Sequence, residues 1–165
     1  MARGDGTIRD RSGYAVIPTQ NWGVAAGTPI TVKQGEPTKY TTLPDIIPCV
    51  DDDVTVGTDT RFTGLAQSDS TETASAAGSV ECYVPLTGVV YAMKATTSSN
   101  FNTVALITAA KGLRETFDLI SSTFTFDENA GDGATNALCI VGGDATTATV
   151  YFTIVNDATY LGWNA

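Results

Sequence analysis

The chain contains no histidine at any of its 165 positions. Histidine is the commonest general base near neutral pH and the commonest zinc ligand, and it completes the Ser–His–Asp and Cys–His arrangements. The sequence also lacks the phosphate loop Gly-x-x-x-x-Gly-Lys-Ser/Thr, the dinucleotide-binding Gly-x-Gly-x-x-Gly after a strand, and the Gly-x-Ser-x-Gly of serine hydrolases. Carboxylates and thiols are therefore the side chains left to consider for chemistry.

Two acidic clusters are candidate sites for a hard cation such as Ca²⁺. Asp51, Asp52 and Asp53 are consecutive, and three consecutive side chains rarely converge on one centre. The second cluster, residues 127–133, lacks the spacing and the final bidentate glutamate of a calcium loop. Both are predicted to be solvated turns, and we expect no metal, no cofactor and no catalytic residue. A glycosidase-like carboxylate pair depends on a separation of ~5–9.5 Å that only the fold sets, so a hydrolase stays as a third-ranked hypothesis.

The three cysteines are Cys49, Cys82 and Cys139, which are far apart, odd in number and without Cys-x-x-Cys spacing. Each lies in an apolar, strand-like stretch, where a free cysteine behaves as a small hydrophobic residue. This usage fits synthesis in a reducing compartment such as a bacterial cytoplasm, and it leaves one disulfide open.

The formal net charge is −9, from nine basic and eighteen acidic residues. A nucleic-acid-binding protein normally presents a basic face, so we expect no direct nucleic-acid partner and interpret the acidity as an aid to solubility. No apolar run approaches the ~20 residues of a membrane span, and the N-terminus has no apolar core of a signal peptide. We therefore expect no membrane contact and no export signal.

Residues 78–95 give the clearest local pattern. Val80, Cys82 and Val84 alternate with other side chains, and the same alternation resumes at Val89 and continues through Tyr91, Met93 and Ala95. A period of two places successive side chains on opposite faces of a sheet. Pro85 and Gly88 suit a turn between the two runs. The stretch predicts a β-hairpin.

The rest of the chain predicts short strands separated by turns, because only 16% of residues are charged while β-branched residues and glycines are frequent. Strands are expected at 14–17, 29–33 (Ile30 and Val32 inward), 45–50 (interrupted by Pro48), 61–67 (with a bulge or close backbone approach at Gly64), 114–120, 123–127, 137–141 and 148–155. Loops are expected at 21–23, where Trp22 is exposed, at the polar segment 68–77, and at the Gly142–Asp144 turn.

One helix is predicted over residues 103–111, with Asn102 as its N-cap and Gly112 just past its end. Val104, Ile107 and Ala110 would share a face. The expected fold is mostly β: a small β-barrel, jelly-roll or sandwich-like domain with one short helix and an extended N-terminal arm. Strand order stays open.

The arm comprises residues 1–13, and residues 14–165 form a single β-rich domain in this interpretation. Arg3, Arg9 and Arg11 concentrate positive charge in this polar segment, which has no periodicity. It is expected to order on a partner, although a frayed terminus would give the same pattern.

Several short segments together resemble the capsid decoration, or cement, proteins of tailed bacteriophages. They are Phe62–Ala66, Ala77–Tyr83, Pro85 with Gly88, Phe124–Gly131 and Gly142–Asp144, within a likeness that covers about residues 28–155. The resemblance implies a small β-rich protein, often a homotrimer, on the outer capsid surface of the virion. It would bind the major capsid protein after shell expansion and tie neighbouring capsomers together.

No binding residue is carried over from the family. On the residues alone, the arm with Arg3, Arg9 and Arg11 is the candidate capsid contact, and it would bind by adding a strand to an exposed sheet edge. The alternative is a virion-surface or tail-associated binding module that recognises carbohydrate or a host protein. Trp22 and Trp163 motivate it, since aromatic faces stack on sugars.

Overall fold

The chain is described by a computed structural model that covers residues 7–10, 16–28, 30–42, 45–51, 53, 61–86, 88–120, 123–129, 131, 133 and 135–155. Its strands are β1 (Thr7–Asp10), β2 (Thr19–Val24), β3 (Pro37–Thr42), β4 (Asp45–Pro48), β5 (Arg61–Leu65), β6 (Gly78–Tyr83), β7 (Val90–Lys94), β8 (Arg114–Ile120), β9 (Thr123–Asp127), β10 (Leu138–Asp144) and β11 (Thr149–Ile154). A 3₁₀ turn, η1 (Ser98–Asn100), precedes the helix α1 (Val104–Ala110). The predicted mostly β fold with one short helix is confirmed.

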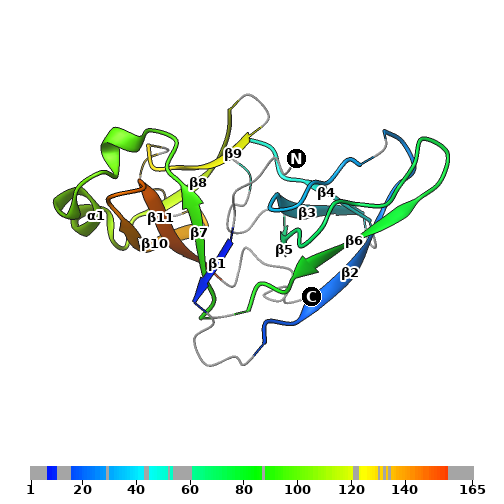
Figure 1. The fold of residues 1–165 in the computed structure, drawn as a ribbon, viewed down its shortest axis with the longest axis horizontal. Coiled ribbons are helices and arrows are strands. Elements are labelled where there is room, and N and C mark those ends of the chain that lie inside the picture. Colours follow the sequence, from blue (N-terminus) through cyan, green and yellow to red (C-terminus); the bar gives the residue numbers. More distant parts are fainter. Residues whose placement is uncertain are drawn as a thin grey trace.

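The strands form two sheets that lie side by side (Figure 1). One has five strands in the order β5-β3-β4-β2-β6, and the other has six in the order β1-β7-β11-β10-β8-β9. Within the named strands the pairs are antiparallel, apart from the parallel contact of β2 with β4 at Gly23 and Asp45.

The five-stranded sheet curls until its two end strands meet, and the six-stranded sheet closes in part, with β1 left at its outer edge. A bridge between Ala66 and Cys82 joins the end of β5 to β6, and a bridge between Ala95 and Phe126 joins the end of β7 to β9. Closing a sheet in this way reduces the number of exposed strand edges. Of the architectures expected from the sequence, the barrel-like one describes this structure best.

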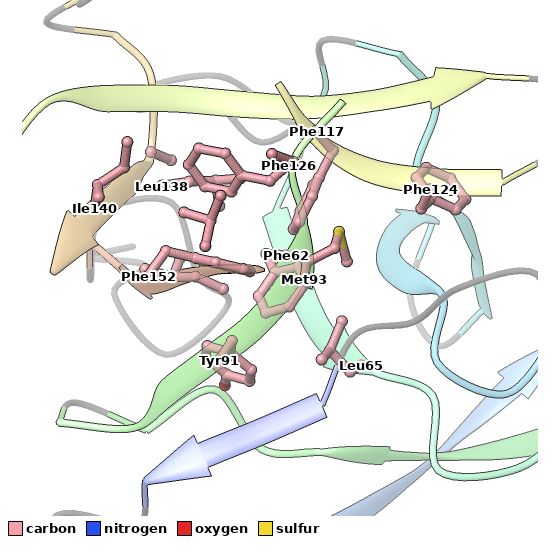
Figure 2. Close-up of a cluster of buried hydrophobic side chains, with 14 of the residues drawn as sticks. Phe62, Leu65, Tyr91, Met93, Phe117, Phe124, Phe126, Leu138, Ile140 and Phe152 are labelled. Atoms are coloured by element: carbon pink, nitrogen blue, oxygen red, sulfur yellow. The ribbon is translucent and has the colours of Figure 1, made fainter. Parts of the chain in front are cut away.

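Two hydrophobic clusters stabilise the molecule. The smaller one lies in the five-stranded sheet and is formed by Trp22, Val24, Val32, Ile46, Ala66, Val80 and Cys82. The larger one combines Phe62 and Leu65 of β5 with residues of the six-stranded sheet, among them Tyr91, Met93, Phe117, Phe124, Phe126, Leu138 and Phe152 (Figure 2). The rings of Phe62 and Tyr91 are 6.2 Å apart, which is within the range of favourable aromatic pairs. The larger cluster therefore spans both sheets.

The predicted hairpin over residues 78–95 is wrong in its pairing, although both strands exist. β6 pairs with β2, whereas β7 pairs with β11 and β1 in the other sheet. The backbone N–H of Val84 donates to the carbonyl of Pro18, so β6 continues beside β2 and the segment that follows crosses between sheets. The predicted alternation is correct, since Val80, Cys82 and Val84 are buried. The strands that pair with β6 and β7 are distant in sequence, so a local pattern does not reveal them.

The loop predicted at Trp22 is also wrong. Trp22 belongs to β2, and its side chain is only 6% exposed in the smaller cluster. The strand expected before it does not form at Val16 and Ile17; Tyr14 and Ala15 lie outside the described residues. The strand expected at 29–33 is likewise absent over residues 30–33, where Val32 is buried as predicted but Ile30 is exposed at a φ of 56°.

The polar segment 68–77 is irregular, as predicted, but not wholly exposed. Ser70 and Glu72 are buried, because they hydrogen-bond to the backbone of the segment 31–32. The Gly142–Asp144 turn is wrong as well, since these residues continue β10.

Other predictions are confirmed. β8 and β9 have the predicted bounds, and Phe124 and Phe126 share a buried face. Gly64 marks both a register shift in β5 and a close approach: its φ is 139°, and a Cβ there would lie 2.1 Å from the carbonyl oxygen of Tyr83. The helix forms, but its N-cap is Thr103 rather than Asn102, since the Thr103 hydroxyl accepts from the N–H of Leu106.

Of the predicted arm, Thr7–Asp10 form β1, which pairs with β7 at Ala92, Tyr91 and Val90. The register shifts between Ile8 and Asp10, so Arg9 lies at the irregularity. Arg3, Arg11 and the other arm residues lie outside the described part of the chain, as does the tail with Trp163. The division at residue 13 stays a prediction.

Candidate functional site

The first acidic cluster forms a hydrogen-bonded turn. Asp53 pairs with the Lys39 ammonium at 2.5 Å and accepts from the N–H of Val50, and its side chain is only 11% exposed. Asp51 accepts from the N–H of Leu119 at 3.2 Å and thereby links the turn after β4 to β8. Asp53 is therefore not the solvated carboxylate that the sequence predicts; Asp52 lies outside the described residues.

The second cluster connects β9 to the segment before α1. Glu128 accepts from the N–H of Thr97 at 2.9 Å, and Asn129 accepts from the Asn100 side chain at 2.7 Å. Asp127 accepts from the N–H of Asn129 at 2.9 Å, which closes the turn. Within the described ranges, no three Cys, Asp or Glu side chains are grouped so that they could hold a metal ion.

The three thiols are free. Burial, followed by the negative charge of Asp53, raises the pKa of Cys49 well above its usual value. Burial raises the pKa of Cys82 to about 11. Since the thiolate is the nucleophilic form, Cys49 and Cys82 are protonated and unreactive at neutral pH.

A pocket of about 430 Å³ opens between the two sheets, and we call it the junction pocket. Its lining comes from the segment before β3, the end of β4, β8 and β9: Thr31, Glu36, Ile47, Pro48, Cys49, Val50, Leu119 and Phe124. Phe124 and Cys49 are each 1% exposed and form its deep part, whereas Val50, at 50% exposed, lies at its rim. Figure 2 shows Phe124 on β9 at one end of the aromatic cluster.

The polar end of the junction pocket is Glu36 with Thr31. The Glu36 side chain is 1% exposed, and its Oε2 accepts from the N–H of Lys33 at 2.7 Å. The N–H of Gly35 donates to the carbonyl of Ala66, and the N–H of Ala66 donates to the carbonyl of Glu36, both at 2.9 Å. These bonds fix the turn 33–36 against the end of β5 and so place Glu36 beside the apolar lining.

A second hollow of about 620 Å³, the helix groove, lies between α1 and the β10–β11 turn. Gly142 and Gly143 contribute only backbone to it, while Lys111 and Asp144 supply its charges. The N–H of Thr146, and then the Thr147 hydroxyl, hold the pKa of Asp144 below its ordinary value. The groove is more polar than the junction pocket. Its carboxylate, Asp144, already accepts hydrogen bonds from Thr146 and Thr147 in the β10–β11 turn.

Of the three predicted site residues, Arg9 alone lies in the described part of the chain. Arg9 is in β1, and Arg3 and Arg11 are not among the described residues. The residues of the junction pocket were missed because each lies in an unremarkable local context; Glu36, for example, lies in the turn Lys33–Pro37. No local signal distinguishes its buried carboxylate from the many exposed ones.

Comparisons with known proteins give no relative: no family model, curated protein or solved structure matches the chain. In the described part of the chain, no helix is long and apolar enough to cross a membrane. The function is therefore argued from the residues and the geometry.

Proposed function

We propose that the chain is a capsid decoration protein of a tailed bacteriophage. It would bind the major capsid protein on the outer surface of the head and stabilise the shell by bridging neighbouring capsomers. The segments that suggested the family support this proposal in part, since Phe62–Ala66 and Ala77–Tyr83 largely correspond to β5 and β6. Those two strands meet at the bridge between Ala66 and Cys82 that closes the five-stranded sheet.

The proposal depends on the position of β1 at the edge of the six-stranded sheet. This four-residue strand pairs with β7 only, and among the described residues no strand pairs with its outer edge. An edge of this kind recognises another chain through main-chain hydrogen bonds, with little demand on side-chain identity. The N-terminal segment would therefore join the molecule to the shell through β1 or its neighbouring residues.

Capsid binding is the decisive test. Heads of the phage that encodes the chain, expanded and lacking their own decoration protein, are mixed with the intact protein and sedimented. We expect saturable co-sedimentation and a higher temperature of head disruption. A chain lacking residues 1–13 should bind much more weakly, provided that circular dichroism shows it to be folded. Absence of binding by the intact protein overturns the proposal, and equal binding by the truncated chain overturns the role of the arm.

The proposed assembly is a homotrimer, because closed symmetric rings bury surface that one subunit leaves exposed. Light scattering over a range of concentrations should give three times the 17.2 kDa mass of one chain. A carbohydrate-binding function is not proposed alongside, since Trp22, one of the two tryptophans that motivated it, is buried.

A further inference from the structure

We propose that the Lys39 ammonium and the Asp53 carboxylate condense to an amide, so that an intramolecular isopeptide bond joins β3 to the turn after β4. The inference does not depend on the capsid function. Lys39 Nζ lies 2.5 Å from Asp53 Oδ2, closer than the ~2.7–2.9 Å of an ordinary charge-assisted hydrogen bond. Because Asp53 Cγ is bonded to that oxygen, the nitrogen and the carbon that would react are less than about 4 Å apart, near the ~3–3.5 Å of a reactive conformer.

The pair is enclosed by the protein. The side chains of Lys39 and Asp53 are 14% and 11% exposed. After burial itself, the charges of Asp53 and Lys39 shift the pKa of the Cys49 thiol in opposite directions, and Cys49 is only 1% exposed, so the pair borders the buried core. Holding two charges in such surroundings costs free energy that a neutral amide does not. Exclusion of water also favours the amide, because the water that condensation releases leaves for the bulk solvent.

The backbone of the turn after β4 positions the Asp53 carboxylate. The N–H of Val50 donates to Oδ2, and the N–H of Asp53 donates to the carbonyl of Val50 at 3.3 Å. The N–H of Cys49 donates to the carbonyl of Pro37 at 2.9 Å, which holds this turn against the start of β3, two residues before Lys39. The N–H of Val50 also stabilises the negative charge that develops on Oδ2 during attack, as an oxyanion hole does.

The reaction balances within the pair. One proton passes from the Lys39 ammonium to the Asp53 carboxylate, which gives a neutral amine and a carboxylic acid. Nζ then attacks Cγ, the Cγ–Oδ1 bond breaks, and Oδ1 leaves as water with a second proton from Nζ. Oδ2 stays as the carbonyl oxygen of the new amide, and no co-reactant is consumed.

The bond would close a loop from residue 39 to residue 53, with β4 inside it. A covalent closure restricts the unfolded chain, as a disulfide does. Unlike a disulfide, it needs no oxidising compartment, which suits a chain whose three thiols are free.

Another ion pair supplies an internal control. Lys33 Nζ lies 3.5 Å from Asp69 Oδ2, and these two side chains are 21% and 40% exposed. Water reaches this pair and its atoms are farther apart, so Lys33 should stay an unmodified amine.

The test is the mass of the denatured chain. Loss of one water lowers the mass of the 17.2 kDa chain by about 18 Da, which mass spectrometry resolves. Trypsin cleaves after unmodified lysines, so it should cut after Lys33 but release residues 34–61 as one fragment, one water lighter than its sequence. Full mass after purification and again after prolonged incubation of the folded protein would overturn the proposal and leave an ion pair only.

Two variants locate the bond. Lys39→Arg keeps a cation beside Asp53 but removes the amine, so it should restore the full mass. Asp53→Asn keeps the carbon that is attacked and should still form the bond, with ammonia in place of water as the leaving group. A loss of water that persists in Lys39→Arg would place the dehydration elsewhere, such as an aspartate cyclised onto the next backbone nitrogen, and would refute the assignment. If a variant does not fold, the tryptic fragments of the unmodified chain decide.

Discussion

At the scale of single residues, Glu72 shows how this acidic chain uses a buried carboxylate. The Glu72 side chain is 2% exposed and accepts from the N–H of Thr31, while the neighbouring Ser70 hydroxyl bonds both the N–H and the carbonyl of Val32. Burial raises the pKa of Glu72, but hydrogen bonds from Ser70 and Thr31 outweigh it and bring the pKa below 4.5. The ionised Glu72 side chain therefore holds the irregular segment 68–77 against the irregular segment at Thr31 through a hydrogen bond.

The lowered pKa predicts a pH-dependent loss of stability. Because the folded-state pKa lies below the unfolded one, ionised Glu72 contributes stability above about pH 4.5, and that contribution is lost as the pH falls through the folded-state pKa. We expect Glu72→Gln to lower the free energy of unfolding at pH 7 and to approach the unmodified protein below pH 4.5. Urea denaturation across this range measures it.

An exposed carboxylate serves as the control for this prediction. Glu81→Gln on β6 should cost little at any pH, since Glu81 is exposed. A stability difference for Glu72→Gln that is the same at pH 7 and at pH 3 would contradict the assignment of the lowered pKa to Glu72.

Two adjacent glycines of β10 predict very different outcomes. A Cβ at Gly143 would lie 2.4 Å from a ring carbon of Phe101, which is fully buried, whereas one at Gly142 would meet nothing closer than 3.8 Å. Gly143→Ala is expected to cost about 2 kcal/mol or more through overpacking, and Gly142→Ala less than about 1 kcal/mol. Urea unfolding midpoints measure both. Equal effects would mean that both the Phe101 ring and the backbone at the Thr149 carbonyl oxygen, which lies 2.7 Å from that Cβ, move aside.

At the scale of elements, the start of α1 is set by one hydroxyl. The helix has seven residues and buries Ile107, so its own backbone bonds stabilise it only marginally and capping matters. Thr103 has an extended backbone, and its hydroxyl accepts from the N–H of Leu106 at 3.2 Å. Asn102, one residue earlier, is also a residue type that caps helices, but it does not occupy the N-cap position.

The cap predicts a contrast between neighbouring alanine variants. Thr103→Ala should reduce the free energy of unfolding by about 1 kcal/mol, and Asn102→Ala by less than about 0.5 kcal/mol. Thr103→Ser, which keeps the hydroxyl, should recover most of the loss. A larger cost for Asn102→Ala than for Thr103→Ala in thermal and urea unfolding would show that the helix begins earlier.

At the scale of the whole molecule, the larger hydrophobic cluster joins the two sheets. Phe62 extends from β5 to within 6.2 Å, ring to ring, of both Tyr91 and Phe117 in the other sheet. Because apolar packing across the junction is continuous, we expect both sheets to unfold together. Tryptophan fluorescence and far-UV circular dichroism should then give coincident transitions.

Truncating this contact tests the coupling. Phe62→Ala should cost about 3–5 kcal/mol, because it removes a buried ring and leaves a cavity. Phe62→Leu fills more of the space and should cost less. Two separated transitions in the unmodified protein would contradict coupling through the larger cluster, as would a loss of under about 1 kcal/mol for Phe62→Ala.

Most of the strands, and the faces of them that are buried, can be predicted from the amino-acid sequence alone. Alternation is a local property of an extended backbone, so Phe124 and Phe126 on β9, or Val80 and Cys82 on β6, are recognisable without any partner. The bulge at Gly64 was also recognisable locally, because a glycine inside a strand often marks a bulge or a close approach of another backbone segment.

The pairing of those strands cannot be predicted in the same way, because it depends on tertiary contacts. The crossing after β6, the burial of Trp22 and the extension of β10 through Gly143 depend on partners that are distant in sequence. The candidate site depends on such partners entirely. Glu36 and Leu119 line one pocket because the turn before β3 and the strand β8 meet between two sheets, and the free energy that joins them comes from long-range packing that no local pattern records.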